Sequence, residues 1–506
     1  MKTKLVSFRD KFIFLALVYI VNHIYILALW DAVFWDDWIL FDTDHAILIG
    51  RFEQAGTPFG WVGYFHALLL ALGPWAYRVL VFITYFCAGL LVVKILERRG
   101  GIWGAYSIVI GTMFMIVPLN AARVAGINAP YATCYLVFFL AWYLIESHKF
   151  LASILFLFSF NTNSLLVFYV LPVCDLIFPN KQVRYVDIWE LIKKNWILLG
   201  LPLLYFFIKV YFFSPYGFYK NYNNEFSFYN IKHALSLQIS EIDRLFSPSA
   251  ELLLVVGFTA GLSIVIWPIL NRMQLSKFLP CDVFNRRKLL IMALMGVAAL
   301  ILAGFPYWLV GHPQRFYNWD SRHQILMPLG VAIILASLFG LLPKNIRKVY
   351  FCFLLALFLV LNVQSYYAYY IDWNKQKAII DIISHQPLIK EGRLIVFEDH
   401  TEIPNARGRT NSIYEWNGML KYIYKDEKRY GINQRDWTSK ICGSNHISFS
   451  PYYKAGEINN AHTNKVVLVK IFRDKPIGLS LIDKIIDEVY PSLRIVIEDD
   501  KDYCRR

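Results

Sequence analysis

The sequence predicts a polytopic α-helical membrane protein with a soluble C-terminal α/β domain. Hydrophobic residues make up 57% of its 506 residues and charged residues 17%, whereas soluble domains average roughly 45–50% and about 25%. Apolar runs recur from residue 12 to residue 370, and several are long enough to cross a hydrocarbon core of about 30 Å. Residues 371–506, by contrast, hold 22 Lys and Arg with 19 Asp and Glu. We therefore expect a transmembrane domain at residues 1–370 and a soluble domain at residues 371–506.

Apolar length predicts about eleven transmembrane helices. We place them at residues 12–30, 76–96, 102–118, 130–146, 150–161, 164–178, 196–213, 250–270, 289–309, 325–342 and 348–370. Alternate loops between them are basic, as at Arg98-Arg99, Lys193-Lys194 and Arg286-Arg287-Lys288. Because Lys and Arg concentrate in cytoplasmic loops, this pattern predicts a cytoplasmic N-terminus. Topology thus explains the net charge of +14, and we expect no nucleic-acid partner.

Two apolar segments determine whether this count is odd or even. Residues 60–75 are apolar enough to cross, but a crossing there would move Arg98-Arg99 to the outer side. We therefore expect a helix that lies at the outer interface. Residues 150–178 are short for two crossings, yet one long helix would move Lys193-Lys194 outside. Two short helices broken at residues 161–164 are the better interpretation.

The C-terminal domain is expected to combine short buried strands with helices. Runs rich in Val, Ile and Leu predict strands at 393–397, 466–471 and 493–497, and periodicity predicts helices at 412–424 and 481–489. An odd number of crossings places this domain outside the cytoplasm. The chain has no Asn-x-Ser/Thr sequon, which favours a bacterial inner membrane with the domain in the periplasm. Cys442 and Cys504 would then form a disulfide or remain two free thiols.

The loop after the first span is the most informative segment for function. The first outer loop, residues 31–75, begins with five carboxylates within 14 residues, which are Asp31, Asp36, Asp37, Asp42 and Asp44. Adjacent carboxylates in a partly apolar site raise one pKa, which suits a general base, so we expect Asp36 and Asp37 to be catalytic. The neighbouring Trp35 and Trp38 could stack on a sugar ring. The alternative is that Asp36 and Asp37 cap a helix that begins near Ile39.

A second candidate segment is the outer loop at residues 311–324, which carries two Arg and two His. The positive-inside rule disfavours bases on this side, so their presence needs a reason. Arg is the preferred bidentate binder of phosphate, and we expect Arg315, Arg322 and His323 to bind one. The alternative is that Arg322 and His323 reach lipid headgroups without a further role.

Weaker signals add secondary candidates. His66 in the interfacial helix is more often a satisfied interface histidine than a functional one. Asp42-Thr43-Asp44 matches the DxD pattern of metal-binding sugar transferases, a tripeptide too common to assign a metal. No phosphate-binding loop or dinucleotide motif occurs, so we expect no nucleotide cofactor. Any substrate should already be in the membrane or reach it there.

These motifs resemble those of the GT-C superfamily of integral-membrane glycosyltransferases. The matching features are the Trp-Asp-Asp-Trp sequence at 35–38, the interfacial helix around His66, the Gly-Pro-x-x-x-Arg stretch from Gly73 to Arg78, and the outer loop at 321–328. The resemblance covers about the first 100 residues and residues 311–328. The His-Pro-Pro stretch of some family branches is absent at residues 56–60.

The resemblance implies a polyprenyl-phosphate-linked sugar as donor and a glycan or glycolipid as acceptor. Asp36 or Asp37 would deprotonate the acceptor hydroxyl, which attacks the anomeric carbon with inversion. Arg322, with Arg315 and His323, would offset the charge on the leaving phosphate. The acceptor would be an O-antigen, another surface polysaccharide or lipid A, and the periplasmic domain would bind it. We expect no certain cofactor and leave a divalent metal open.

Two other functions remain alternatives. A polysaccharide polymerase or ligase also uses outer-loop Arg and His, but it does not require an acidic cluster after the first helix. A transporter or flippase of lipid-linked sugars would be expected to show paired repeats and ionisable residues at mid-membrane. The sequence shows no repeat, and its loop charges gather at the outer face. These observations favour a glycosyltransferase.

Overall fold

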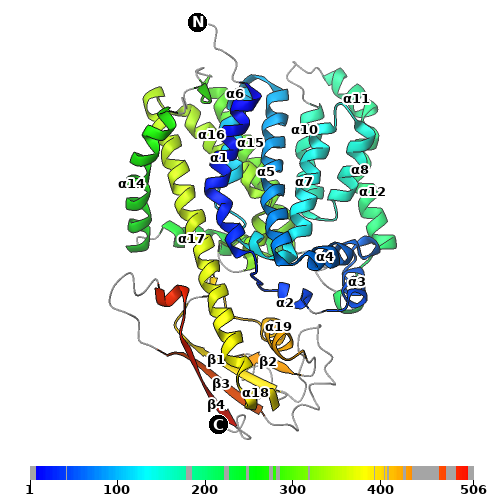
Figure 1. Ribbon diagram of the computed structural model, residues 1–506. Coiled ribbons are helices and arrows are strands. Elements are labelled where there is room, and N and C mark those ends of the chain that lie inside the picture. Colours follow the sequence, from blue (N-terminus) through cyan, green and yellow to red (C-terminus); the bar gives the residue numbers. More distant parts are fainter. Residues whose placement is uncertain are drawn as a thin grey trace.

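A helical bundle with a small sheet below one of its ends makes up the computed structural model (Figure 1). We call the end next to the sheet the sheet end and the other the opposite end. The structure describes residues 7–41, 43–177, 185–220, 227–246, 250–272, 277–280, 285–316, 319–391, 394–403, 405–406, 409–425, 429–435, 466–474 and 486–499.

Every apolar segment predicted to span is helical. These helices are α1 (Phe8–His23) with the 3-10 helix η1 (Ile24–Leu29), α5 (Pro74–Arg99), α6 (Gly101–Ile116), α7 (Ala129–Leu144), α8 (Lys149–Ser159), α9 (Ser164–Phe168), α10 (Val170–Ile177), α12 (Trp196–Phe212), α14 (Ala250–Arg272), α15 (Arg286–Leu309), α16 (Met327–Leu341) and α17 (Lys344–Ser384). The break between α8 and α9 falls at residues 160–163, as predicted.

Five apolar helices within the described residues are long enough to cross a membrane. They are Phe8–Leu29, Pro74–Arg99, Gly126–Leu144, Arg286–Leu309 and Lys344–Ser384. Large apolar side chains on the bundle surface are exposed, among them Leu253, Leu254 and Ile264 on α14. Exposed apolar side chains of this kind on long helices suit contact with lipid rather than water. The chain has the architecture of a helical membrane protein.

Helices α15 and α16 pack closely because two glycines face each other. A Cβ atom on Gly330 would lie 2.8 Å from the carbonyl oxygen of Gly296, and one on Gly296 would lie 3.0 Å from that of Gly330. Only a hydrogen in place of a side chain allows this backbone approach, and small residues serve the same purpose between transmembrane helices. The pair fixes the position of the loop between α15 and α16.

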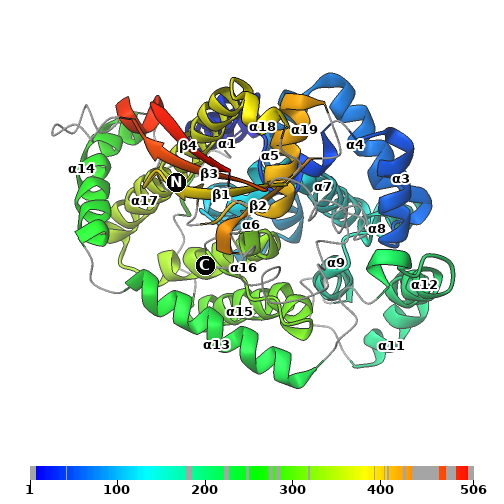
Figure 2. The ribbon, with the colours of Figure 1, turned by 90° about the horizontal axis from the view of Figure 1, so that it is seen from below.

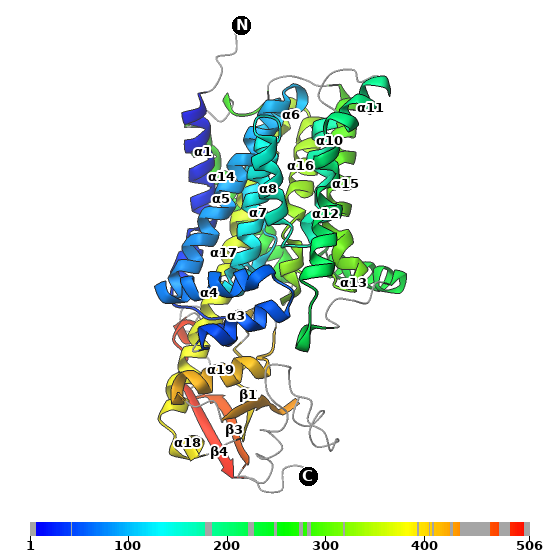
Figure 3. The ribbon, with the colours of Figure 1, turned by 90° about the vertical axis from the view of Figure 1, so that its right-hand side faces the viewer.

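Several helices lie across the sheet end instead of along the bundle. These are α2 (Asp37–Leu40), α3 (His45–Gln54), α4 (Trp61–Leu72) and α13 (Phe228–Phe246). Figures 2 and 3 show α3, α4 and α13 at the base of the upright helices. Helix α4 is the segment predicted to be interfacial, and its crosswise orientation agrees with that prediction. A further short helix, α11 (Tyr185–Lys194), lies at the opposite end.

Helix α17 continues from the bundle to the sheet without interruption. Its 41 residues extend about 60 Å at 1.5 Å per residue. Buried residues occur along its whole length, from Arg347 to Ile383. The composition change at residue 370 therefore falls inside a helix, and the predicted domain boundary there is not a linker. The short helix α18 (Pro387–Glu391) follows and leads into the sheet.

The C-terminal unit, residues 387–499, is built on a four-stranded sheet. Its strands are β1 (Leu394–His400), β2 (Tyr430–Asn433), β3 (Val466–Arg473) and β4 (Leu493–Asp499), in the order β2-β1-β3-β4. Strand β1 is parallel to β2 and β3, and β4 is antiparallel to β3. Helix α19 (Ile413–Tyr424) packs on this sheet, with Trp416 stacked on Phe397 at 4.2 Å between ring centroids.

The three predicted strands and the predicted helix at 412–424 are confirmed, whereas β2 was not predicted because it is only four residues long. Of the helix predicted at 481–489, residues 486–489 are described and helical. Cys442 and Cys504 lie outside the described residues, so the choice between a disulfide and two thiols stays a prediction.

Candidate functional site at the sheet end

The two predicted loops meet at the sheet end. The ring of Trp35 packs edge to face on Trp319, with 4.7 Å between centroids. Trp319 begins the 3-10 helix η7 (Trp319–Gln324), which forms the last part of the second loop. Trp35 directly precedes Asp36 and Asp37, so the acidic and basic loops lie side by side.

The second loop is held by hydrogen bonds to the 3-10 helix η3 (Ala121–Val124) and the residue before it. The backbone N–H of Ala122 donates to Oγ of Ser321 at 3.0 Å. The backbone N–H of Asn120 donates to Oε1 of Gln324 at 2.9 Å. Both side chains are buried, so η7 has a fixed place beside the first loop.

Asp37 is fully engaged by backbone groups. Its Oδ2 accepts from the N–H of Gly126 at 2.8 Å and of Phe34 at 3.3 Å, and its Oδ1 accepts from the N–H of Ile127 at 2.7 Å. Only 2% of Asp37 is exposed. Burial raises its pKa to about 6, while the Arg78 guanidinium and these N–H groups oppose the rise. Asp37 thus ties the first loop to the 3-10 helix η4 (Gly126–Asn128).

Arg78 supports the same loop from α5. Its Nε donates to the carbonyl oxygen of Leu29 at 3.1 Å, and its Nη2 donates to that of Ala32 at 2.6 Å. The guanidinium lies 5.7 Å from the ring centroid of Phe34. Arg78 is buried, so it orders the chain that leads to the two aspartates and contacts no solvent.

Asp36 differs from its neighbour in having no backbone donor among the residues that the structure describes. It precedes α2 but makes no capping hydrogen bond within the described part of the chain, so the capping alternative fails for this residue. Its half-buried carboxylate lies beside the Tyr414 hydroxyl and near the Arg322 guanidinium. Burial raises the pKa of Asp36, and both of these groups partly offset the rise.

Arg322 is held in place by two aromatic neighbours. Its guanidinium carbon lies 4.5 Å from the ring centroid of Trp319. Its Nε donates to Nε2 of His323 at 3.2 Å, which requires an unprotonated Nε2. His323 is neutral because burial, with the charge of Arg322 and the neighbouring His312, lowers its pKa far below the ordinary value. His323 is 5% exposed, so it orients Arg322 in this structure and does not reach a ligand directly.

Arg315 lies on the same loop but is partly turned towards an acid. Its Nε is 3.8 Å from Oδ2 of Asp320, and about one third of the side chain is exposed. That Nε is buried and lacks a hydrogen-bond partner among the residues that the structure describes. Arg315 is therefore adjacent to η7 and has donor capacity left for an anion.

The remaining predicted residues do not gather around Asp36. Asp44 is exposed and caps α3 by accepting from the N–H of Ala46 at 2.8 Å. Asp31 accepts from Nε1 of Trp373 at 3.0 Å. Asp42 lies outside the described residues. Among the described carboxylates of this loop, Asp31, Asp36, Asp37 and Asp44 therefore have different neighbours.

The predicted aromatic and histidine candidates are packed inside the protein. Trp35 is 2% exposed and Trp38 is 3% exposed, so in this structure neither indole is open to a sugar ring. His66 is buried, its Nδ1 lies 3.0 Å from the Tyr77 hydroxyl, and its ring stacks on Phe52. Its Nε2 has no hydrogen-bond partner among the described residues.

The C-terminal unit contributes residues that the sequence did not single out. Tyr414 contacts Asp36, and the buried Arg409 pairs with Asp372 at 3.0 Å and with Glu415. The available signal was the capping-box pattern Ser412-x-x-Glu415, which predicts a helix start around Tyr414. That pattern says nothing about a partner near the other end of the chain.

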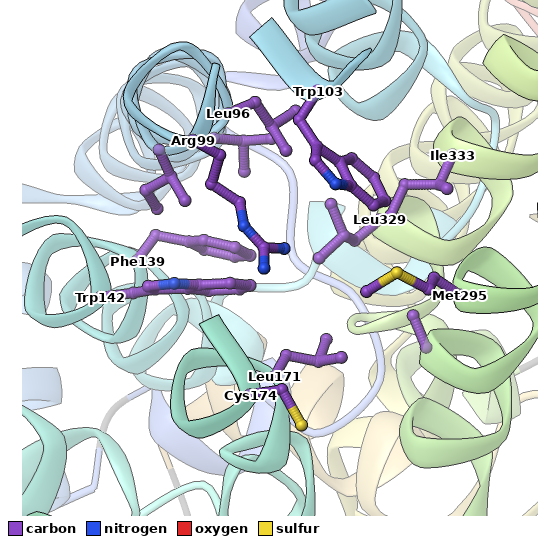
Figure 4. A pocket seen from close by; sticks show the side chains of 13 residues that line it. Leu96, Arg99, Trp103, Phe139, Trp142, Leu171, Cys174, Met295, Leu329 and Ile333 are labelled. Atoms are coloured by element: carbon purple, nitrogen blue, oxygen red, sulfur yellow. The ribbon is translucent and has the colours of Figure 1, made fainter. Parts of the chain in front are cut away.

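A cavity near the opposite end is a poor candidate for the same chemistry. It lies between α5, α6, α7, α10, α15 and α16, and Figure 4 shows the Arg99 side chain pointing into it between Trp103 and the stacked rings of Phe139 and Trp142. Its other lining residues are almost all apolar. Arg99 is ion-paired with Asp175 at 2.5 Å, so its charge is already balanced.

Within the described residues, no group of three or more His, Cys, Asp or Glu side chains is arranged to hold a metal ion. Comparison with known protein families, with curated proteins and with solved structures finds no match to this chain. The function is therefore inferred from the geometry at the sheet end.

Proposed function

We propose that the protein is a membrane glycosyltransferase that moves a sugar from a polyprenyl-phosphate donor to a cell-envelope glycan or glycolipid. The observation that carries the proposal is that Asp36 and Arg322 lie on adjacent loops, which meet where Trp35 packs on Trp319 and Arg322 lies over the Trp319 ring. A half-buried carboxylate, with no backbone donor among the described residues, lies near a guanidinium on a neighbouring loop, where the apolar helices end. This arrangement offers a base for the acceptor and a cation for the leaving phosphate.

The proposed setting is the outer face of a bacterial inner membrane. Eleven crossings, a cytoplasmic N-terminus and a periplasmic C-terminal unit would put both loops and the sheet on the outer side. The proposal is supported by the placement of charge. The basic pair Arg98-Arg99 lies at the end of α5 far from the sheet, and Arg286-Arg287-Lys288 begins α15 at that same end. Basic residues at the end away from the sheet agree with a cytoplasmic side there.

The proposed reaction is a single displacement with inversion. Asp36 accepts the proton of the acceptor hydroxyl as its oxygen forms a bond to the anomeric carbon. The bond from that carbon to the phosphate oxygen breaks, and polyprenyl phosphate leaves with the electron pair. Arg322 offsets the charge that grows on this oxygen. Asp36 then releases its proton to water, which restores the base.

The two neighbouring aspartates take different roles in this proposal. Asp37 already accepts three backbone hydrogen bonds, so its lone pairs are directed away from a substrate. Asp36 has no backbone donor among the described residues and keeps capacity for an acceptor proton. Neutral His323 contributes by orienting Arg322. Arg315 is the second candidate for phosphate, because its Nε has no hydrogen-bond partner among the residues that the structure describes.

The test is sugar transfer in membranes that contain wild type, Asp36→Asn, Arg322→Ala or Asp44→Asn, with protein levels checked in each. Radiolabelled polyprenyl-phosphate sugars are supplied, and label in the glycan and glycolipid fractions is counted. We expect Asp36→Asn to lose about 10²- to 10⁴-fold in rate, the usual contribution of a general base. Arg322→Ala should also be impaired. Asp44→Asn is the matched control, an exposed helix cap in the same loop, and should transfer normally.

Three outcomes would contradict the proposal. Normal transfer by Asp36→Asn would remove the base assignment. Transfer of whole oligosaccharides by wild type would favour a polymerase or ligase. Movement of labelled lipid between leaflets, with no transfer from any donor, would favour a flippase.

A further inference from the structure

We infer that the C-terminal unit forms part of the reaction site, with Tyr414 as the residue that positions the carboxylate of Asp36. The inference rests on the proposed function, because it assigns Tyr414 a role in the same reaction. It starts from a contact between distant parts of the chain, in which the hydroxyl of Tyr414, on the face of α19 that packs on Trp38, lies beside the carboxylate of Asp36 in the first loop.

Helix α19 is docked closely on α2. A Cβ atom on Gly418 would lie 2.6 Å from Cβ of Trp38 and 3.0 Å from its carbonyl oxygen, so only glycine permits this approach. On the next turn of α19, the ring of Tyr422 lies 6.3 Å from that of Trp38, edge to face. Nε1 of Trp38 donates to Oε1 of Gln376 on α17 at 3.0 Å. The C-terminal unit therefore covers the first loop directly.

The start of α19 is fixed by its own capping groups. Ser412 and Glu415 form a capping box, in which the N–H of Ser412 donates to Oε2 of Glu415 at 2.7 Å. Tyr414 lies between these two residues, in the first turn of the helix. The capping box therefore fixes the backbone position of Tyr414 independently of its contact with Asp36.

A buried ion-pair network then joins this helix start to α17. Nη1 of Arg409 donates a hydrogen bond to Glu415. Nε and Nη2 of Arg409 each donate to Asp372, at 3.1 Å in both bonds. Its guanidinium also lies 5.5 Å from the ring centroid of Trp35, the residue before Asp36. The network thus fixes Tyr414 relative to α17 and lies against the loop that carries Asp36.

In this arrangement Tyr414 orients the carboxylate of Asp36 and takes no part in bond making or breaking. A hydroxyl that donates to a carboxylate favours its charged form and fixes which oxygen remains free for the acceptor. Tyr414 keeps its own proton throughout and does not react. Hydrogen bonds to a charged group contribute about 1.5–3 kcal/mol, which corresponds to roughly 10- to 100-fold in rate when the bond serves the reaction.

The test uses the full-length protein in membranes and the variant Tyr414→Phe, which removes one oxygen atom and keeps the ring. We expect transfer to fall about 10- to 100-fold at neutral pH, with thermal stability unchanged. Without the donated hydrogen bond the pKa of Asp36 rises, so the acid limb of the rate–pH profile should move to higher pH. Tyr422→Phe is the matched control on the same helix and should leave both rate and profile unchanged.

The result separates this inference from the proposed function. If wild type transfers sugar and Asp36→Asn does not, the function stands. A wild-type rate and profile for Tyr414→Phe would then overturn the positioning role alone. A lower rate with an unmoved acid limb would also overturn it, because that result indicates a structural contribution only. If wild type transfers nothing, the proposed function fails first.

Discussion

Asp37 and Ile127 are joined by a hydrogen bond of 2.7 Å, in which the backbone N–H of Ile127 donates to Oδ1 of the carboxylate. With the parallel bond from Gly126, it fastens the first loop to the segment between α6 and α7. Asp37 thus has a structural role, whereas Asp36 has no backbone donor among the described residues. The two residues can be distinguished by stability as well as by activity.

Replacement of Asp37 by Ala should destabilise the protein, whereas Asp36→Ala should not. The change at Asp37 leaves the buried N–H groups of Gly126 and Ile127 without acceptors, at about 1–3 kcal/mol for each. Thermal melting of the purified variants in detergent measures the difference. Equal melting temperatures for the two variants would contradict the structural role of Asp37.

Replacement of Arg409 by Met should loosen the C-terminal unit. The change leaves Asp372 and Glu415 buried without their shared cation, and breaking a buried pair in this way costs about 3–5 kcal/mol. Limited proteolysis after residue 400, followed over time, reports the loosening. Lys470→Met is the control, because its pair with Glu498 is partly exposed and contributes about 0–1 kcal/mol. Equal cleavage rates in the two variants would contradict the prediction.

The stability of the C-terminal unit should depend on pH through Glu415. Burial raises the pKa of this carboxyl group from 4.5 to about 6, so the folded state binds its proton more tightly than the unfolded state does. Ionised Glu415 therefore costs stability above about pH 6, and the cost disappears as the pH falls towards 4.5. Relative to Glu415→Gln, wild type should gain melting temperature between pH 7 and pH 5. A constant difference between the two proteins would show that Glu415 has an ordinary pKa.

Replacement of Gly330 by Val should disrupt the α15–α16 contact. The new side chain would meet the carbonyl oxygen of Gly296 at 2.8 Å, and overpacking of this kind costs about 1–3 kcal/mol or more. Gly257→Val on α14 is the control, since a Cβ there has no neighbour within 4 Å. Melting temperatures in detergent compare the two, and a similar loss in both would exclude the close contact as the cause.

The helices and strands were largely predictable because they depend on local pattern. Apolar length predicted the helices of the bundle, and Val- and Ile-rich runs predicted β1, β3 and β4. The continuation of α17 past residue 370 was not predictable, because the polar residues that follow suggested the end of the membrane helix. Asp372 and Lys375 continue α17 since both are buried and paired there.

The candidate site was predictable only in part, for a similar reason. The residues in the two outer loops could be named from their charge, and the structure places the two loops side by side through Trp35 and Trp319. Which carboxylates share a site depends on contacts with distant residues. Asp37 is engaged by Gly126, Asp31 by Trp373, and Asp36 by Tyr414. No periodicity within residues 31–44 encodes those partners.

Because α17 is one continuous helix, the number of residues in it determines both the distance of the C-terminal unit from the bundle and its rotation about the helix axis. In a hingeless helix, each inserted residue lifts the chain beyond it by about 1.5 Å and turns that chain by about 100°. Tyr414 can therefore reach Asp36 at one phase of the helix only, and an insertion of two residues near position 370 would turn the unit by more than half a revolution. The length of α17 therefore fixes the distance between the bundle and the sheet, and its rotation fixes which face of α19 is turned towards the first loop.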